Sequence, residues 1–151
     1  MSGMGMKVSG LDELLVRLVY DTPRVKDNAR KVMHRQSDAI KDRAVLYAPI
    51  DDGELEKSIH TEKSYEDNGR LTIAIVAGGI VDGVDVDKYA AEIHENYSSM
   101  KPGPGTIAKR LANPGVYIGE KFLDRAAKDS EEKLTKAMIK SIITDLKDIF
   151  K

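Results

Sequence analysis

From Leu11 onward, the apolar residues of the N-terminal part of the chain recur at helical spacing. Residues 1–5 show no such spacing, and we expect them to form a loose leader. Thr22-Pro23 marks the start of a long helix, because threonine can cap a helix and proline suits its first position. This helix should end at Ala48-Pro49, since the residue before a proline disfavours helical geometry. Ahead of it, a short helix over residues 11–19 is predicted by Leu11, Leu14, Leu15 and Leu18.

The C-terminal segment, residues 120–150, is predicted to form another long helix. A continuous helix of this length would span roughly 46 Å. Its apolar side chains fall close to one helical face: Leu123, Ala127, Leu134, Met138, Ile142 and Ile149.

Between the long helices the pattern changes to that of a β-hairpin. Residues 58–65 and 70–77 are short runs on either side of Asn68-Gly69, a dipeptide that strongly favours a tight hairpin turn. In the second run, apolar residues occupy almost every position, so this strand should be largely buried. Residues 87–95 are compatible with a helix or a strand, and we favour the helix.

Residues 96–115 are predicted to be a long flexible loop. They contain Pro102-Gly103-Pro104-Gly105 and Asn113-Pro114-Gly115, and such proline and glycine clusters usually interrupt regular structure. We find no internal repeat and no second domain boundary. The predicted fold class is therefore α+β: a single domain over residues 1–151, with long N-terminal and C-terminal helices packed on a small central antiparallel β-sheet with a hairpin.

Composition narrows the possible functions. The 151 residues contain no cysteine, which excludes disulfides, thiolate nucleophiles and cysteine-based zinc sites. No stretch approaches 18 uninterrupted apolar residues, so we expect a soluble protein made in the cytoplasm, with no membrane partner. The net charge is −1, but residues 22–47 carry seven Lys or Arg against three Asp, and residues 81–96 carry five acidic residues against one Lys. Opposite patches on one molecule allow head-to-tail self-association.

The residues capable of catalysis or metal binding do not form a recognisable motif. His34, His60 and His94 do not have the spacing of a zinc site. A calcium site at the aspartates of residues 82–87 is an alternative to a solvated acidic loop, although an EF-hand's length and final Glu are missing. Asp51 and Asp52 fit a turn better than a pair for acid–base chemistry. We expect no enzyme activity, no cofactor and no metal.

Three segments, taken in order, carry a family pattern. Residues 9–14 read Ser-Gly-Leu-Asp-Glu-Leu, similar to an opening Gly-Leu-Asp-x-Leu. Residues 48–59 read Ala-Pro-Ile-Asp-Asp-Gly-Glu-Leu-Glu-Lys-Ser-Ile, similar to Ala-Pro-Val-Asp-Thr-Gly-x-Leu-Arg-x-Ser-Ile, and this match is the most specific. Residues 89–95 and 122–126 are similar to Tyr-Ala-x-x-Val-Glu-x-Gly and Pro-Phe-Leu-x-Pro-Ala. Together they resemble the tail-completion, or head–tail joining, proteins of long-tailed bacteriophages. The chain departs from the family pattern at Asp52, Asn96, Lys121 and Arg125.

The second segment also has a direct physical interpretation. Pro49 should stop the helix, and Asp51 with Gly53 should turn the chain toward the hairpin. Apolar residues after the turn would then pack beneath it. The predicted structural residues of the motif are Pro49, Asp51, Gly53, Leu55, Ser58 and Ile59.

The resemblance implies a structural virion protein. Members form rings, commonly hexameric, between the portal or neck and the tail tube, so neck, connector, tail-tube and tail-terminator proteins are the expected neighbours. The subunit would be made in the host cytoplasm and could be a monomer in isolation. We expect the 96–115 loop to order on contact with other subunits. Possible contacts between subunits pair Asp82, Asp85 and Asp87 with Arg30, Lys31 and Arg35.

Two other functions remain open. A DNA-binding accessory protein in phage DNA packaging or processing would use the basic face of the first long helix, although a solvated face explains the same charges. DNA could also contact the lumen of the ring. A peptide- or toxin-binding module would use the hairpin edge. The basic face of the first long helix consists of Arg24, Arg30, Lys31, Arg35, Lys41 and Arg43.

Overall fold

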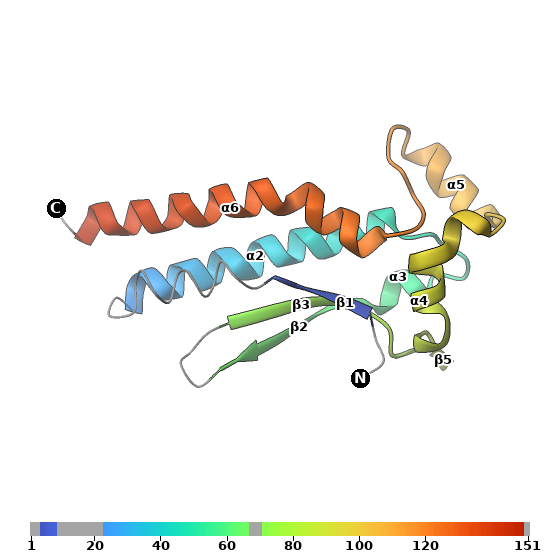
Figure 1. Cartoon of the computed structure of the whole chain (residues 1–151), viewed down its shortest axis with the longest axis horizontal. Coiled ribbons are helices and arrows are strands. Elements are labelled where there is room, and N and C mark those ends of the chain that lie inside the picture. Colours follow the sequence, from blue (N-terminus) through green and yellow to red (C-terminus); the bar gives the residue numbers. More distant parts are fainter. Residues whose placement is uncertain (1–3, 9–22, 67–70, 150–151) are drawn as a thin grey trace.

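The computed structural model describes residues 4–8, 23–66 and 71–149, shown in Figure 1. The predicted helix over residues 11–19 and the Asn68-Gly69 turn lie outside these residues. Within them the chain combines long helices with small antiparallel sheets, which confirms the predicted α+β class.

Both predicted long helices are present. Helix α2 spans Pro23–Tyr47 and helix α6 spans Phe122–Ile149, and the two lie side by side in Figure 1. Their apolar faces meet in the core, where Met33 of α2 and Met138 of α6 are each 1% exposed. Asn28 Nδ2 donates to both carboxylate oxygens of the buried Asp145 at 3.1 Å, so this buried acidic group is hydrogen-bonded.

The predicted hairpin strands pair in an antiparallel sheet that packs against α2. Strand β2 spans Ile59–Tyr65 and strand β3 spans Leu71–Ala77, with Ile59 opposite Ala77 and Tyr65 opposite Leu71. β3 is central and largely buried, as predicted, whereas most of β2 is exposed at the edge of the sheet. Because α2 contacts both this sheet and α6, it lies at the centre of the molecule.

The expectation of a loose leader at the N-terminus is wrong for residues 4 and 5. Strand β1, Met4–Val8, pairs antiparallel with β3 on the side opposite β2, giving the order β1-β3-β2. A five-residue strand containing a glycine has too short an alternation to stand out from sequence. Its pairing partner, the buried β3, supplies the hydrogen bonds that define it.

The remaining elements gather at one end of the molecule (Figure 1). They are α3 (Glu54–Ser58), strands β4 (Ile80–Val81) and β5 (Val84–Asp85), α4 (Asp87–Asn96), the 3-10 helix η1 (Tyr97–Ser99) and α5 (Pro104–Ala112). Helix α4 confirms the helical interpretation of residues 87–95.

The predicted flexible loop over residues 96–115 is wrong, because η1 and α5 occupy most of it. Pro104 stands at the start of α5, where a proline costs no hydrogen bond, and Gly103 precedes it in an extended conformation. At the other end, Asn113 Nδ2 donates to Lys109 O at 2.9 Å and satisfies a terminal carbonyl. Residues that look like loop signals in sequence therefore delimit a helix. Among the helices described, none has a stretch apolar and long enough to cross a bilayer.

Candidate functional site

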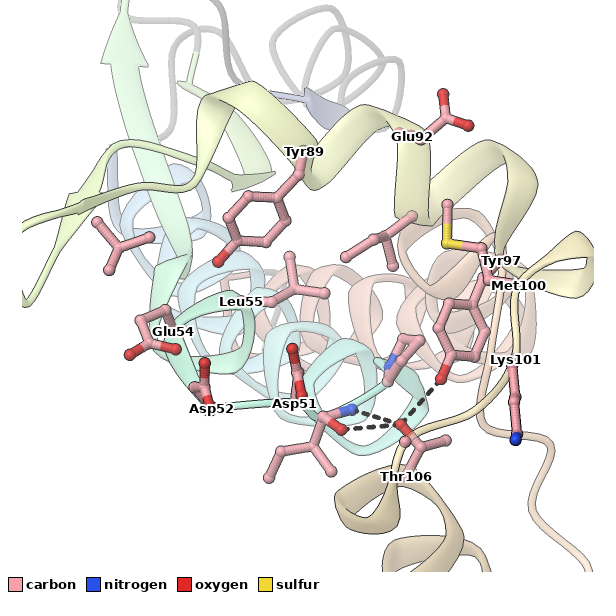
Figure 2. Close-up of a pocket in the computed structure, with 16 residues that line it drawn as sticks. Asp51, Asp52, Glu54, Leu55, Tyr89, Glu92, Tyr97, Met100, Lys101 and Thr106 are labelled. Atoms are coloured by element: carbon pink, nitrogen blue, oxygen red, sulfur yellow. Dashed lines mark hydrogen bonds between the residues drawn. The ribbon is translucent and has the colours of Figure 1, made fainter.

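A pocket of about 500 Å³ opens between the motif turn, α4 and the segment leading into α5 (Figure 2). The turn contributes residues 49–55, which include most of the family-like motif. The other walls come from Tyr89, Glu92 and Ile93 of α4, Tyr97 of η1, and residues between Met100 and Thr106. Segments about 50 positions apart in the chain therefore form one site.

The motif turn folds as its sequence predicts. Pro49 is buried directly after α2, and Gly53 has φ of 93°, a left-handed conformation that favours glycine. Leu55 and Ile59 are 5% and 3% exposed, so both pack beneath the turn as expected. Ser58 is buried and its hydroxyl donates to Leu55 O at 2.7 Å. Pro49 and Gly53 redirect the chain, while these residues anchor it to the core.

Thr106 is the hydrogen-bonding centre of the pocket floor. Its Oγ1 donates to Ile50 O at 2.9 Å and accepts from Ile50 N at 3.1 Å and from the Tyr97 hydroxyl at 3.0 Å (Figure 2). A hydroxyl has one proton and two lone pairs, so all of its capacity is used. Thr106 is 1% exposed, and this saturated group joins the motif turn, η1 and α5 without an unpaired polar atom.

Lys109 attaches α5 to the C-terminal end of α2. Its Nζ donates to Val45 O at 2.6 Å and to Ala48 O at 2.7 Å, and it pairs with Glu56 of α3. The last carbonyls of a helix have no partner within the helix, and a cation there is favoured by the helix dipole. One side chain thus satisfies the end of α2 and holds α3 and α5 against it.

A close backbone approach accompanies these bonds. A Cβ at Gly105 would meet Ile50 O at 3.0 Å and Ile50 Cγ2 at 3.1 Å, closer than ordinary contact. At Gly103 the nearest atom would be Asp51 Oδ1 at 3.7 Å, an ordinary separation. The start of α5 therefore lies so close to the motif turn that a Cβ at position 105 would require Ile50 to shift by a few tenths of an ångström.

The open side of the pocket is acidic. Figure 2 shows Asp51, Asp52 and Glu54 grouped along one side, with the Tyr89 hydroxyl directed toward them. The pKa of Tyr89 is raised above its usual 10.0, first by burial and then by Glu54, Asp51 and Asp52. Glu92 lines the pocket from α4, and Lys101 is the one lining residue of opposite charge. Among the described residues, no hydrogen bond or ion pair engages these four carboxylates.

Beneath this rim the pocket is apolar. Leu55 and Tyr97 are buried, while Ile93 and Met100 are partly covered. An apolar floor with a carboxylate rim suits a cationic group on an apolar stem, because the stem leaves water and the charge stays paired at the opening. We name these sixteen lining residues together the acidic pocket.

The predicted acidic contacts lie next to this pocket, on a small hairpin. Asp82 and Gly83 form its two-residue turn, with φ of 50° and 80°, and Val84 lines the pocket. Asp82 pairs with Lys57 at 2.8 Å, and Asp85 Oδ1 accepts from Asp87 N at 3.2 Å. Asp87 Oδ1 in turn accepts from Gly79 N at 3.0 Å. All three aspartates therefore have contacts within the chain.

The predicted basic contacts lie on α2, away from this hairpin. Arg30 is placed over the Tyr65 ring, with Cζ 5.3 Å from its centroid, and lies 3.8 Å from Asp27. Lys31 and Arg35 are exposed on the N-terminal half of α2. This half and the β4–β5 hairpin lie at opposite ends of the molecule in Figure 1, so the structure does not bring the two predicted sets together within one chain.

The three histidines occupy separate places. His34 Nε2 is 3.4 Å from the Tyr65 hydroxyl, and His60 Nδ1 is 2.7 Å from Ser58 O. His94 is buried and packs edge-on against the Phe122 ring at 4.9 Å. Within the ranges that the structure describes, no group of three or more His, Asp or Glu is arranged to hold a metal ion, and the aspartates of residues 82–87 are no exception.

Sequence reasoning missed Thr106 and Lys109. Both lie in the segment interpreted as a loop. Because their backbone partners at and after the end of α2 are more than 50 residues away, no local sequence pattern identifies them. The Asp82-Gly83 turn could have been predicted from sequence, because Asp-Gly flanked by Val81 and Val84 is a signal for a two-residue hairpin. Comparisons with protein-family models, curated proteins and solved structures found no match to this chain.

Proposed function

We propose that this chain is a structural virion protein at the head–tail junction of a tailed phage or prophage. It forms an oligomeric ring that completes the tail or joins it to the head, and its neighbours are neck or connector proteins on one side and tail-tube or terminator proteins on the other. Assembly takes place in the host cytoplasm, and the finished site is the neck of the virion.

The observation that carries this proposal is the structure of residues 48–59. This most family-like segment follows α2, forms α3 and starts β2, and its buried residues Ala48, Leu55 and Ile59 belong to the apolar core. Its exposed carboxylates, Asp51 and Asp52, line the acidic pocket. A segment that both organises the fold and presents a charged surface supports a scaffold subunit that contacts neighbours.

The separation of charge supports head-to-tail association. Acidic groups line one side of the pocket at one end of the molecule, and Lys31 and Arg35 are exposed at the other. A contact between unlike surfaces repeats from subunit to subunit and closes into a ring when its rotation allows. Pairing of Asp82, Asp85 and Asp87 with Arg30, Lys31 and Arg35 of the next subunit stays a prediction, and it requires rearrangement of the contacts that these residues make within one chain.

The test is the mass of the purified protein by light scattering across a concentration series, with and without neck and tail-tube proteins encoded beside it. We expect a ring-sized mass, alone or with such a partner, and ring-shaped particles by electron microscopy. A mass that stays at that of a monomer under all of these conditions contradicts the proposal.

The structure supports the DNA-binding alternative less well. Arg43 donates to Asp129 O and to Ser130 Oγ, and Arg30 is placed over Tyr65, so part of the basic set is engaged within the chain. The exposed Lys31 and Arg35 are interleaved with acidic side chains on the same helix. Retention on heparin at moderate salt tests this alternative, since phosphate contacts require it and ring formation does not.

A further inference from the structure

Helix α6 exposes an apolar and basic face that nothing in the described chain covers. Ile139 and Ile143 are 51% and 46% exposed although both are large apolar side chains. Lys136, Lys140 and Lys147 are also exposed. The spacing of three, four and seven residues places all five on one side of the helix. We call Lys136, Ile139, Lys140, Ile143 and Lys147 the α6 stripe.

The α6 stripe and the acidic pocket are complementary in chemistry. The stripe offers two branched apolar side chains flanked by three cations, and the pocket offers an apolar floor rimmed by carboxylates. Lys136 already pairs with Glu132 at 2.6 Å, whereas Lys140 and Lys147 are open to solvent. The carboxylates of Asp52 and Glu54 also lack a partner among the described residues.

The two surfaces of one chain lie too far apart to meet. In Figure 1 the C-terminal part of α6 ends at one extreme of the molecule, and α3, α4 and α5 gather at the other. Helix α6 is a rigid element of 28 residues, so it cannot fold back on the pocket. The α6 stripe of a second copy can reach the pocket, because the two molecules are free to approach each other.

We propose that the acidic pocket receives the α6 stripe of a second copy of this chain. Ile143 or Ile139 enters the apolar floor beside Leu55, and the flanking lysines pair with Asp52 and Glu54 at the rim. Each copy then offers one pocket and one stripe, and repetition of this contact builds a head-to-tail array that a ring closes. This contact rests on the proposed ring function and identifies the surfaces that would hold the ring together.

Disulfide trapping tests the contact directly, because the chain has no cysteine of its own. Asp52→Cys is mixed with Ile143→Cys, and disulfide dimers are followed on a non-reducing gel under mild oxidation. The control replaces Ile143→Cys with Glu131→Cys, an exposed position on a different side of the same helix. We expect the first pair to cross-link on the order of tenfold faster, because docking raises the effective concentration of the two thiols.

Charge reversal is an independent test of the same contact. Asp52→Lys/Glu54→Lys and Lys140→Glu/Lys147→Glu should each abolish self-association of the otherwise unmodified protein. Mixing the two should restore it, because the reversed pocket fits the reversed stripe and the native surfaces still fit each other. Glu131→Lys is the matched control and should associate like the unmodified protein. Circular dichroism and the thermal midpoint confirm that each variant is folded.

The outcomes separate this contact from the proposed function. Equal cross-linking of test and control pairs, or self-association that survives both reversals, overturns the pocket–stripe contact even if rings form. Specific trapping and complementary rescue support it. If trapping is specific but no ring-sized particle forms with any neck or tail partner, the contact stands and the neck function fails. Absence of both trapping and self-association overturns the contact.

Discussion

The two ends of this protein differ in what adds to their shared apolar packing. The body, made of α2, α6 and the three-stranded sheet, is held by apolar packing, with Leu71, Ile73 and Ile75 fully buried along β3. At the pocket end, made of α3, α4, α5 and the β4–β5 hairpin, Leu55, Val86 and Ala90 extend the same apolar core, and a few polar side chains also bind distant backbone groups. Thr106 and Lys109 alone account for four hydrogen bonds to the backbone at and after the end of α2.

This difference has a physical consequence. Apolar burial is spread over many contacts and has no required direction, so the body should unfold as a unit. A hydrogen bond from Lys109 or Thr106 acts at one point and depends on geometry. Loss of such a bond should release α5 locally while the helices and sheet of the body remain folded.

The largest expected effect is in the body. Ile73→Ala should lower the free energy of unfolding by roughly 2–5 kcal/mol, because it leaves a cavity in a site with no solvent access. Urea denaturation followed by circular dichroism measures the loss. A matched substitution at the edge strand, Lys63→Ala, should change stability by less than about 0.5 kcal/mol, because that side chain is exposed. Equal effects at both positions would contradict the assigned core.

A smaller and more local effect is expected at the pocket end. Lys109→Ala leaves Val45 O, Ala48 O and Glu56 without their shared donor, at a cost of about 2 kcal/mol. Hydrogen exchange should show lost protection in α5, with α2 and α6 largely unchanged. Lys133→Ala, on the exposed face of α6, is the control and should leave exchange in α5 unaltered. Global loss of protection in the Lys109 variant would show that the two ends are not separable.

A pair of glycine substitutions tests the close approach of α5. Gly105→Ala places a methyl group against Ile50 O and should cost about 1 kcal/mol through overpacking. Gly103→Ala meets its nearest atom at 3.7 Å and should be close to neutral. Thermal midpoints of the two variants give the comparison. If Gly103→Ala is the more damaging of the two, α5 does not pack on the motif turn as described.

The smallest effect is electrostatic and leaves the fold unchanged. Glu54→Gln should lower the pKa of Tyr89, because Glu54 contributes to its rise after burial. Glu92→Gln, which does not contribute to that rise, is the control. NMR titration of labelled tyrosine reports the phenol directly. Since the folded pKa of Tyr89 is raised, its contribution to stability is present below pH 10.0 and is lost as pH rises through the folded value.

The elements of this protein differ in how well they could be predicted from sequence. The apolar faces of α2 and α6 repeat with helical spacing over many residues, and β3 is a short, nearly continuous apolar run, so the type and position of these elements were predictable. The motif turn was also predictable, since Pro49 and Gly53 act on the backbone beside them. Strand β1 was not, because its five residues become a strand only by pairing with β3. Helix α5 was misread, because Pro104 and Gly105 are loop signals unless a partner surface holds the segment.

Sequence alone therefore determined what depends on neighbours in the chain: the long helices, the hairpin strands, the turn at residues 49–53 and the absence of cysteine. Tertiary structure decided what depends on distant partners. It brought Asp51 and Glu54 next to Tyr89, placed Thr106 against Ile50 and Lys109 at the end of α2, and left Ile139 and Ile143 exposed between lysines. Local backbone preference acts over a few residues, whereas a pocket exists only where separate segments are packed together.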